Sequence, residues 1–415
     1  MIKWAKDLFP ICRSITGEGT RKTLSYFEKL NPEFKRLKFK TGKKVFDWVI
    51  PKEWNINDAY IEHESGKRFA EFKKSNLHIV GYSKPINKTM HKDELLNHIY
   101  TQEDQPDCIP YVTSYYKERW GFCLSENQKR KLPDGNYRVF IDSKLKNGNL
   151  ELSHAIFKGR TKKEIFFSSY VCHPSMANNE LSGPVLLNAI MHYIKSKYPK
   201  SKYTYRFVLH PETIGSIAYL SKFKKVMKLN TICGFTLTMV GDERAYSYIS
   251  SRKGDTLADE ALKTALLGLS NVINYSFLDR GSDERQYCAP GIDLPLCSFS
   301  RSKRYPEYHT NKDNFDLVTQ KGLMDSFAVI KKIIDALELG IYPKTLVLAE
   351  PNLGKKGLYP TLSQKGKHNE IRLRMNLIAY SDGKTSIFEI AKLLNEPLDK
   401  LCNEYNILKS KKILK

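Results

Sequence analysis

The order of hydrophobic and polar positions divides most of the chain into regions of different texture. Residues 1–33 repeat apolar side chains at helical spacing, as at Leu24 and Phe27. Residues 34–160 carry short alternating runs separated by turn residues, which is typical of β-strands. Residues 161–342 alternate apolar strands with helical segments. We therefore expect one α/β domain formed by 1–33 and 161–342, with a β-rich lid domain inserted at 34–160.

The inserted region contains a turn signal that predicts a β-hairpin. Asn147-Gly148 separates an apolar alternating run, Tyr137–Leu145, from a second run, Asn149–Lys158. An Asn-Gly pair between two such runs is a strong hairpin signal. We therefore expect these two runs to pair with each other.

The α/β region reads as buried strands separated by helices. Residues 164–171, 205–209 and 294–299 are apolar enough for strands buried on both faces, whereas 181–196 and 322–339 have helical spacing. Strands that alternate with helices predict a sheet covered by helices on both faces.

The segment 343–415 has a third character. A loop-rich junction with several prolines and glycines is followed by three short helical patterns near 369–380, 386–394 and 398–405, and by a basic tail at 409–415. This succession predicts a winged helix-turn-helix domain.

Charge and cysteine content narrow the partners and the compartment. The net charge of +23 attracts anionic partners, but the lysines lie in scattered short clusters, so a general lysine bias explains them better than nucleic-acid binding does. The eight cysteines form no C-x-x-C pair. The start of the chain is too charged for a secretory signal, and no apolar run approaches the roughly 20 residues of a membrane span. We expect a cytoplasmic protein with reduced thiols.

Four loops next to the predicted strands carry residues suited to metal chemistry. They contain His173, Glu212, Asp283 and His309. Each residue alone has an ordinary explanation, such as a helix cap for Glu212 or a salt-bridged turn for Asp283. Together they supply the three or four N/O ligands that zinc binds at about 2.0–2.2 Å, and strand ends of an α/β sheet are the usual place for such a site.

The motifs in these loops resemble those of the co-catalytic zinc aminopeptidase superfamily. The segments in question are Val171–Gly183 with Asn-x-x-Ser-Gly-like spacing, His210–Ser216, the Ser282-Asp283 pair and Tyr308-His309-Thr310. The chain is more closely similar to bacterial proteins with an aminopeptidase-like domain, through stretches such as Ile11–Gly17, Trp48–Trp54, Ile109–Tyr116 and Arg119–Cys123. Those proteins carry an inserted β domain and a C-terminal winged helix, and often accompany surface-polysaccharide biosynthesis. The resemblance implies a zinc-peptidase-like α/β/α sandwich with a mixed sheet.

The resemblance also assigns roles. It makes His173 and Asp283 ligands of one zinc ion, and His309 a ligand of a second. Asn179 falls at the position where the peptidases use an aspartate that bridges both ions, and a neutral amide is a poor bridge. Glu212 falls in the segment of the catalytic glutamate, with Glu180 as an alternative base. We expect one or two zinc ions.

The hypothesis that follows is a metal-dependent hydrolase of an amide or related bond. Its substrate would be a small peptide-like molecule or an amidated sugar precursor of a surface glycan. Candidate substrate contacts, which could equally be structural, are Tyr115, Arg119, Arg285, Arg301 and Tyr305. The alternative is a catalytically silent, peptidase-derived binding or regulatory protein that uses its winged helix, which can also serve for packing or homo-oligomerisation.

Overall fold

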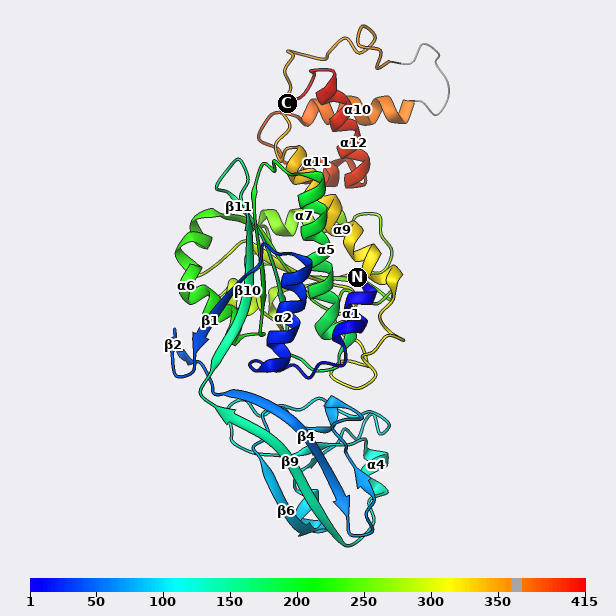
Figure 1. Cartoon of the computed structure of the whole chain (residues 1–415). Coiled ribbons are helices and arrows are strands. Elements are labelled where there is room, and N and C mark those ends of the chain that lie inside the picture. The colour runs from blue at the N-terminus through cyan, green and yellow to red at the C-terminus, as the bar shows by residue number, and fades with distance from the viewer. Residues whose placement is uncertain (360–367) are drawn as a thin grey trace.

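The computed structural model describes residues 1–359 and 368–415. Figure 1 shows a central α/β body, a smaller β-rich body at one end and a group of three helices at the other. The predicted loop-rich junction reaches Pro360, which lies outside the described residues together with the seven that follow it.

A mixed eight-stranded sheet forms the centre of the large body. Four adjacent strands are parallel, and antiparallel neighbours extend the sheet on both sides. In spatial order the strands are β1 (Lys35–Lys40), β10 (Asn149–Phe157), β12 (Thr204–His210), β11 (Glu164–Tyr170), β13 (Thr231–Leu237), β16 (Leu296–Ser300), β14 (Tyr246–Ile249) and β15 (Val272–Tyr275). The parallel strands β12, β11, β13 and β16 therefore end at one edge.

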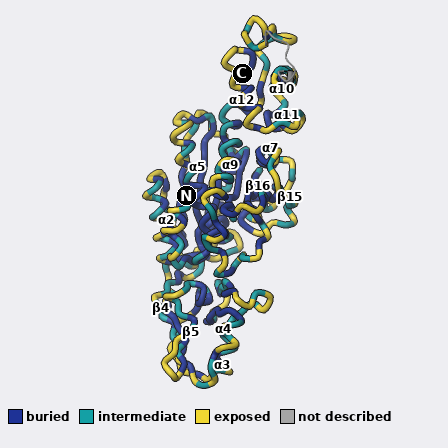
Figure 2. Tube along the Cα trace, turned by 90° about the vertical axis from the view of Figure 1, so that its right-hand side faces the viewer, coloured by how far each residue is buried: buried dark blue, intermediate teal, exposed yellow. Residues whose placement is uncertain are grey.

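Helices cover both faces of this sheet, as the sequence predicts. One face carries α1 (Ile2–Leu8), α2 (Glu18–Leu30), α5 (Ser182–Lys197), α7 (Leu257–Ala265) and α9 (Gln320–Leu339), and the other α6 (Ile214–Asn230) and α8 (Glu284–Tyr287). Successive residues of β11 serve the two layers: Ile165 and Phe167 enter the core under α5, and Phe166 enters the core under α6. Figure 2 shows the resulting buried centre and exposed loops. The α/β/α sandwich with a mixed sheet is confirmed.

The small body is built around a four-stranded antiparallel sheet. Its order is β5 (Arg68–Phe69), β4 (Glu53–His63), β9 (Asn136–Lys146) and β6 (Ile86–His91). Its other elements are β2 (Lys44–Val45), β3 (Trp48–Val49), η1 (Asn76–His78), α3 (Lys92–Leu96), β7 (Ile99–Tyr100), β8 (Phe122–Cys123) and α4 (Glu126–Arg130). Strands β1 and β10 fall within 34–160 but belong to the large sheet, so the boundary between the two sheets lies inside that range.

The hairpin predicted at Asn147-Gly148 is wrong. Strand β9 pairs with β4 and β6, whereas β10 pairs with β1 and β12, so the turn carries the chain from one sheet to the other. Gly148 does not adopt the positive φ that a type I′ hairpin turn requires. A Cβ at this position would lie 2.3 Å from Oε2 of Glu53. Close packing under Glu53, and not turn geometry, explains this glycine.

The C-terminal helices are α10 (His368–Tyr380), α11 (Ile387–Leu394) and α12 (Leu398–Ser410). Single β-bridges join Lys344 to Asp382 and Thr345 to Leu414, so three short extended segments lie beside the helices. The predicted three-helix pattern is confirmed. In Figure 1 this group lies at the end of the large body opposite the β-rich body.

Two smaller expectations concern thiols and membranes. All eight cysteines are free. Among residues 1–359 and 368–415, none of the helices combines the length and apolar composition that crossing a bilayer would require.

Candidate metal centre

The edge where the parallel strands end collects three of the four predicted loops. His173 follows β11, Glu212 follows β12, and His309 lies in the loop after β16. Asp283 comes from a different place, because it is the N-cap residue of the short helix α8. The sheet topology therefore brings together residues that lie up to 136 positions apart in sequence.

His173 is held with one ring nitrogen facing protein and the other facing the site. Its Nδ1 lies 3.0 Å from Oε2 of Glu180, and its Nε2 lies 3.8 Å from Oε2 of Glu212. Burial disfavours the protonated ring, but the hydrogen bond and charge of Glu180 outweigh it and raise the pKa of His173. A carboxylate that accepts from Nδ1 fixes the tautomer whose Nε2 lone pair is free for a metal.

Glu180 itself is fully buried beside an arginine. The guanidinium of Arg13 lies 3.5 Å from Oε1 of Glu180, and neither side chain is exposed. Arg13 also donates to the backbone oxygens of His173 and Leu8, at 2.9 and 2.7 Å. Arg13 therefore neutralises the carboxylate that orients His173 and fixes the backbone of the same histidine.

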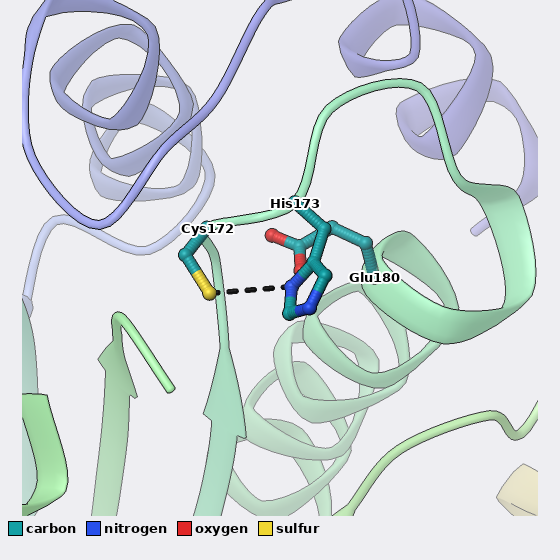
Figure 3. A group of neighbouring side chains, drawn as sticks. All are labelled: Cys172, His173 and Glu180. Carbon is teal, nitrogen blue, oxygen red and sulfur yellow. Dashed lines mark hydrogen bonds and ion pairs between the residues drawn. The ribbon is translucent and has the colours of Figure 1, made fainter. Parts of the chain in front are cut away.

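Among the described residues, one group of three metal-type donors lies within 4.8 Å: Cys172, His173 and Glu180. Figure 3 shows the thiol beside the imidazole, with the Glu180 carboxylate next to the ring. Sγ of Cys172 lies 3.2 Å from Nδ1 of His173 and accepts from the backbone N–H of Glu212. Burial raises the pKa of this thiol well above its ordinary value. We interpret the trio as the support of His173, because it lies on the Nδ1 side of the ring that Glu180 already occupies.

Asp283 is linked to the Glu212 loop through Thr213, the residue that follows Glu212. Oδ1 of Asp283 accepts from the backbone N–H of Thr213 at 2.8 Å and from the hydroxyl of Ser216 at 2.7 Å, whereas Oδ2 has no hydrogen-bond partner. Thr213 adopts φ +63°, a conformation that a β-branched residue rarely adopts. Burial raises the pKa of both Asp283 and Glu212 to about 7. A cation between them would favour the ionised forms.

Asn179 lies in a one-turn π-helix, Ala177–Leu181, whose residues are all buried. Such π-turns are frequent at functional sites. Asp313 holds this turn, because its carboxylate accepts from the backbone N–H groups of Asn178 and Asn179 at 2.5 and 2.9 Å. Oδ1 of Asn179 is buried and has no partner.

His309 is oriented by residues of the inserted region. Its ring stacks on Tyr308 at a centroid distance of 3.8 Å and meets Tyr111 edge-on at 5.2 Å. The backbone N–H of Tyr111 donates to the carbonyl oxygen of His309 at 2.8 Å. Burial lowers the pKa of His309 to about 3, so the ring is neutral. His309 has φ +57°, and its Nε2 has no partner.

Among the described residues, three of the buried polar atoms without a hydrogen-bond partner belong to residues that the sequence assigned to a metal. Asn179 Oδ1, Asp283 Oδ2 and His309 Nε2 are all buried and unpaired. Buried polar atoms without a partner are rare and costly, and an ion would satisfy them. The ring centroids of His173 and His309 are 5.4 Å apart. This spread suits ligands on two sides of a site. The residues present therefore fit a zinc centre. Their positions suit ligands on two sides of the centre better than ligands around a single point.

A cavity of about 520 Å³ opens beside this centre. Asn179, Glu212 and Ser282 line it on the metal side. The remaining lining residues are Tyr170, Thr238, Met239, Ile249, Gly281, Glu284, Ser298, Ser300, Lys303, Arg304, Tyr305, Pro306 and Tyr308. The volume is in the range of small-molecule sites.

The five predicted substrate contacts are placed differently from one another. Tyr305 lines the cavity, although its hydroxyl donates to Asp313 at 2.8 Å. Arg285 is exposed and donates to Oγ1 of Thr213. Tyr115 is partly buried, with its hydroxyl 2.8 Å from that of Tyr111. Arg119 binds the loop at Thr113 and Ser114.

Arg301 is not among the residues that line the cavity. Its guanidinium is stacked 3.7 Å from the ring centroid of Tyr246 and faces Asp325 of α9 at 3.8 Å. It is buried, and two of its nitrogens have no partner. Arg301 therefore contacts the lining through its backbone N–H, which donates to Met239 at 2.8 Å, and its side chain is engaged elsewhere.

Sequence reasoning did not single out four residues that shape the centre. They are Arg13, Tyr111, Cys172 and Asp313, each of which contacts one of the predicted residues. Arg13 and Tyr111 lie in the stretches 11–17 and 109–116, whose similarity to the aminopeptidase-like proteins was the available signal. No local pattern shows that either residue reaches the strand edge.

Comparison with known proteins agrees with this geometry. Residues 2–340 match a family described as a domain of unknown function, DUF4910, and residues 341–415 match a winged helix-turn-helix family. A Clostridium acetobutylicum protein named as a polysaccharide biosynthesis protein with an aminopeptidase-like domain is 41% identical over 394 residues, which are 93% of this chain and 89% of that protein. A crystal structure of a candidate peptidase from the same organism is 38% identical, with a TM-score of 0.91 over 100% of this chain and 95% of its own.

More distant structures share the fold. A zinc aminopeptidase of Bacillus subtilis superposes with a TM-score of 0.57 at 14% identity, over 80% of this chain and 92% of its own. A peptidase M28 precursor from Shewanella amazonensis gives 0.57 at 13% identity, over 84% and 94%. The chain thus belongs to the DUF4910 family, and its large domain, which shares the fold of zinc aminopeptidases, is followed by a C-terminal winged helix.

Proposed function

We propose that the protein is a metal-dependent hydrolase that cleaves an amide or related bond, with zinc as its metal. The observation that carries the proposal is the set of three buried donor atoms without partners, on Asn179, Asp283 and His309, next to His173 with a free Nε2. Structural histidines and carboxylates normally satisfy each other, whereas these leave buried atoms unpaired at the edge of the sheet where Asn179 lines the cavity.

The ligand set divides into two sides. His173 and Asp283 would hold one ion, and His309 would hold a second on the other side of Asn179. The amide of Asn179 carries no charge, so it does little to offset the repulsion between two dications. We therefore infer that the first position is the tighter one. Zinc in such a site polarises the carbonyl group of a substrate and increases the acidity of water.

Glu212 is the residue we assign to proton transfer. Its Oε1 accepts from the Ser282 hydroxyl at 2.8 Å, its Oε2 faces the metal side of His173, and its side chain keeps 23% of its surface open. It can therefore accept a proton from water and return it to the leaving group. Glu180, the alternative base, is fully buried against His173 and Arg13. We assign it the positioning of His173 instead.

The relative named for polysaccharide biosynthesis supports an amidated or N-acylated sugar precursor as the substrate. A small peptide-like molecule is the other substrate class that the fold suggests. We place the reaction in the cytoplasm, where eight unpaired thiols remain reduced.

Metal analysis of the full-length protein tests the proposal. We expect the wild type, loaded with zinc and dialysed, to retain about one ion per chain, and His173→Ala and Asp283→Ala to lose it. His192→Ala is the matched control, because His192 lies on α5 beside Trp4 and away from the site. A wild type that retains no zinc, or a His173→Ala variant that retains all of it, would contradict the proposal.

A second candidate function, nucleic-acid binding, is suggested by the match of 341–415 to winged helices and by the lysines near the end of the chain. In helix-turn-helix proteins the second helix of the motif enters the major groove. Here the corresponding helix is α12, and its Asp399, Asn403 and Asn406 line a cleft shared with Lys331 and Lys332 of α9. Nζ of Lys332 lies 3.6 Å from the carboxylate of Asp399.

Part of the exposed surface of α12 therefore borders α9, and the large body limits the access of a duplex to that part. We therefore rank DNA binding below hydrolysis. A mobility-shift assay at moderate salt checks this ranking. Contacts with phosphate weaken steeply as the salt concentration increases, so tight DNA binding by the wild type under these conditions would favour the second function.

A further inference from the structure

Part of the wall of the cavity carries positive charge. Lys303 and Arg304 lie there, in the loop that follows β16. We propose that this wall binds a carboxylate or phosphate group of the substrate, with the Lys303 ammonium as the main contact. This inference rests on the proposed function, because it names the chemical class of the group next to the bond that is cleaved.

The position of Lys303 suits this role better than that of Arg304. The described part of the chain places no carboxylate within 4.0 Å of Nζ of Lys303, whereas Arg304 is ion-paired with Asp279 at 2.9 Å. Lys303 is half-buried. Its Nζ lies 5.6 Å from the ring centroid of Tyr275 and 3.7 Å from the point where Gly281 would carry a Cβ. The ammonium therefore lies next to the Gly281 loop of the cavity, and it forms no ion pair with a described residue.

The acidic residues of the cavity do not neutralise this cation. Glu284 is buried, and its two oxygens accept from the backbone N–H groups of Gly281 and Ser282 and from the hydroxyl of Ser298. Glu212 is engaged with Ser282 and faces His173. Both carboxylates are thus committed to the loop and the metal side. A partly desolvated ammonium without a counter-ion favours an anionic ligand.

The rest of the lining is mixed. The hydroxyl-bearing residues Thr238, Ser298 and Ser300 lie beside a larger apolar surface that includes Met239 and Ile249. A leucine-like group in this cavity would desolvate Lys303 without pairing it, and that costs free energy. An acidic amino acid residue or an acidic or phosphorylated sugar would pair it.

Hydrolysis of matched substrates tests the inference in the zinc-loaded, full-length protein. The probes are the fluorogenic coumarylamides of glutamate, aspartate, leucine and alanine. We expect kcat/KM to be higher for the acidic pair than for the neutral pair. Lys303→Met, which keeps the length of the side chain, should lower kcat/KM for the acidic probes by about 10- to 100-fold, as expected for a lost charged hydrogen bond, and leave the neutral probes nearly unchanged.

The control is Lys158→Met, because Lys158 is exposed just beyond the end of β10 at the opposite edge of the sheet. Equal hydrolysis of acidic and neutral probes by the wild type, or an acidic preference that survives in Lys303→Met, would overturn the inference and leave the proposed hydrolase intact.

A second readout does not need catalysis. Isothermal titration of glutarate into the zinc-free protein should show binding that weakens at least about tenfold in Lys303→Met and also weakens with added salt. If none of the coumarylamides is cleaved but glutarate binds in this way, the anion site stands and the proposed peptide-type hydrolysis fails. If glutarate does not bind to the wild type, the anion site is refuted.

Discussion

Replacement of Glu180 by glutamine isolates the part of the site that orients His173, the proposed metal ligand. Glu180 and Gln have nearly the same volume, so the fully buried position keeps its packing and loses only its charge. Glutamine can still accept from Nδ1 of His173 at the present 3.0 Å, but without a negative charge. Outer partners of metal-bound histidines typically contribute 10- to 100-fold in affinity, which is about 1.4–2.7 kcal/mol.

The same change leaves the guanidinium of Arg13 buried without its counter-charge. Removal of one partner of a buried pair generally costs about 3–5 kcal/mol of stability. Arg13 keeps two backbone acceptors, and its nitrogen lies 3.5 Å from Glu180, which is longer than a strong ion pair. We therefore expect Glu180→Gln to lose about 3 kcal/mol of stability, the lower end of that range. The double variant Arg13→Met with Glu180→Gln should lose less stability than the two single variants added together.

Two measurements check this reasoning. Competition of the protein with a chromophoric chelator gives the zinc dissociation constant, and urea unfolding gives the free energy of unfolding of the metal-free protein. The expected result is weaker zinc binding in Glu180→Gln, with kcat reduced in parallel. Wild-type zinc affinity in Glu180→Gln, or a double variant less stable than the two single changes added together, would refute the role given to this pair.

Three further predictions follow from other parts of the molecule. Asn179→Asp supplies the missing bridging charge and should raise zinc binding from about one to two ions per chain, measured by equilibrium titration; unchanged stoichiometry contradicts the two-sided site. Gly183→Ala should destabilise the protein by several kcal/mol in urea unfolding, because its Cβ would lie 2.3 Å from both the Leu237 oxygen and Oγ of Ser169. His154 has a pKa lowered to about 4, mainly by burial, so the folded state resists its protonation. The contribution of neutral His154 to the free energy of unfolding is present above the ordinary pKa of 6.5 and is lost as the pH falls toward 4. His154→Gln should therefore flatten this part of the curve of unfolding free energy against pH.

The sequence by itself determined the elements and most of the candidate ligands. Continuous apolar runs such as 164–171 identify strands buried on both faces, because both sides of such a strand must contact helices. Histidines and carboxylates directly after those strands identify the active edge, because parallel strands end together. Local pattern singled out His173, Glu212, Asp283 and His309 as candidates, and the similarity to aminopeptidases added Asn179 and the expected role of each residue.

Only the tertiary structure decided which side chains support, surround or avoid that edge. Arg13 lies 160 positions from His173, and Tyr111 lies 198 positions from His309, so no local pattern links them. Glu180 and Glu212 look equally suited to be a base in the sequence, but burial beside Arg13 separates a positioning carboxylate from one that faces the cavity. Hydrophobic periodicity reports which face of an element is buried, whereas the contacts of a buried charge depend on how distant elements pack.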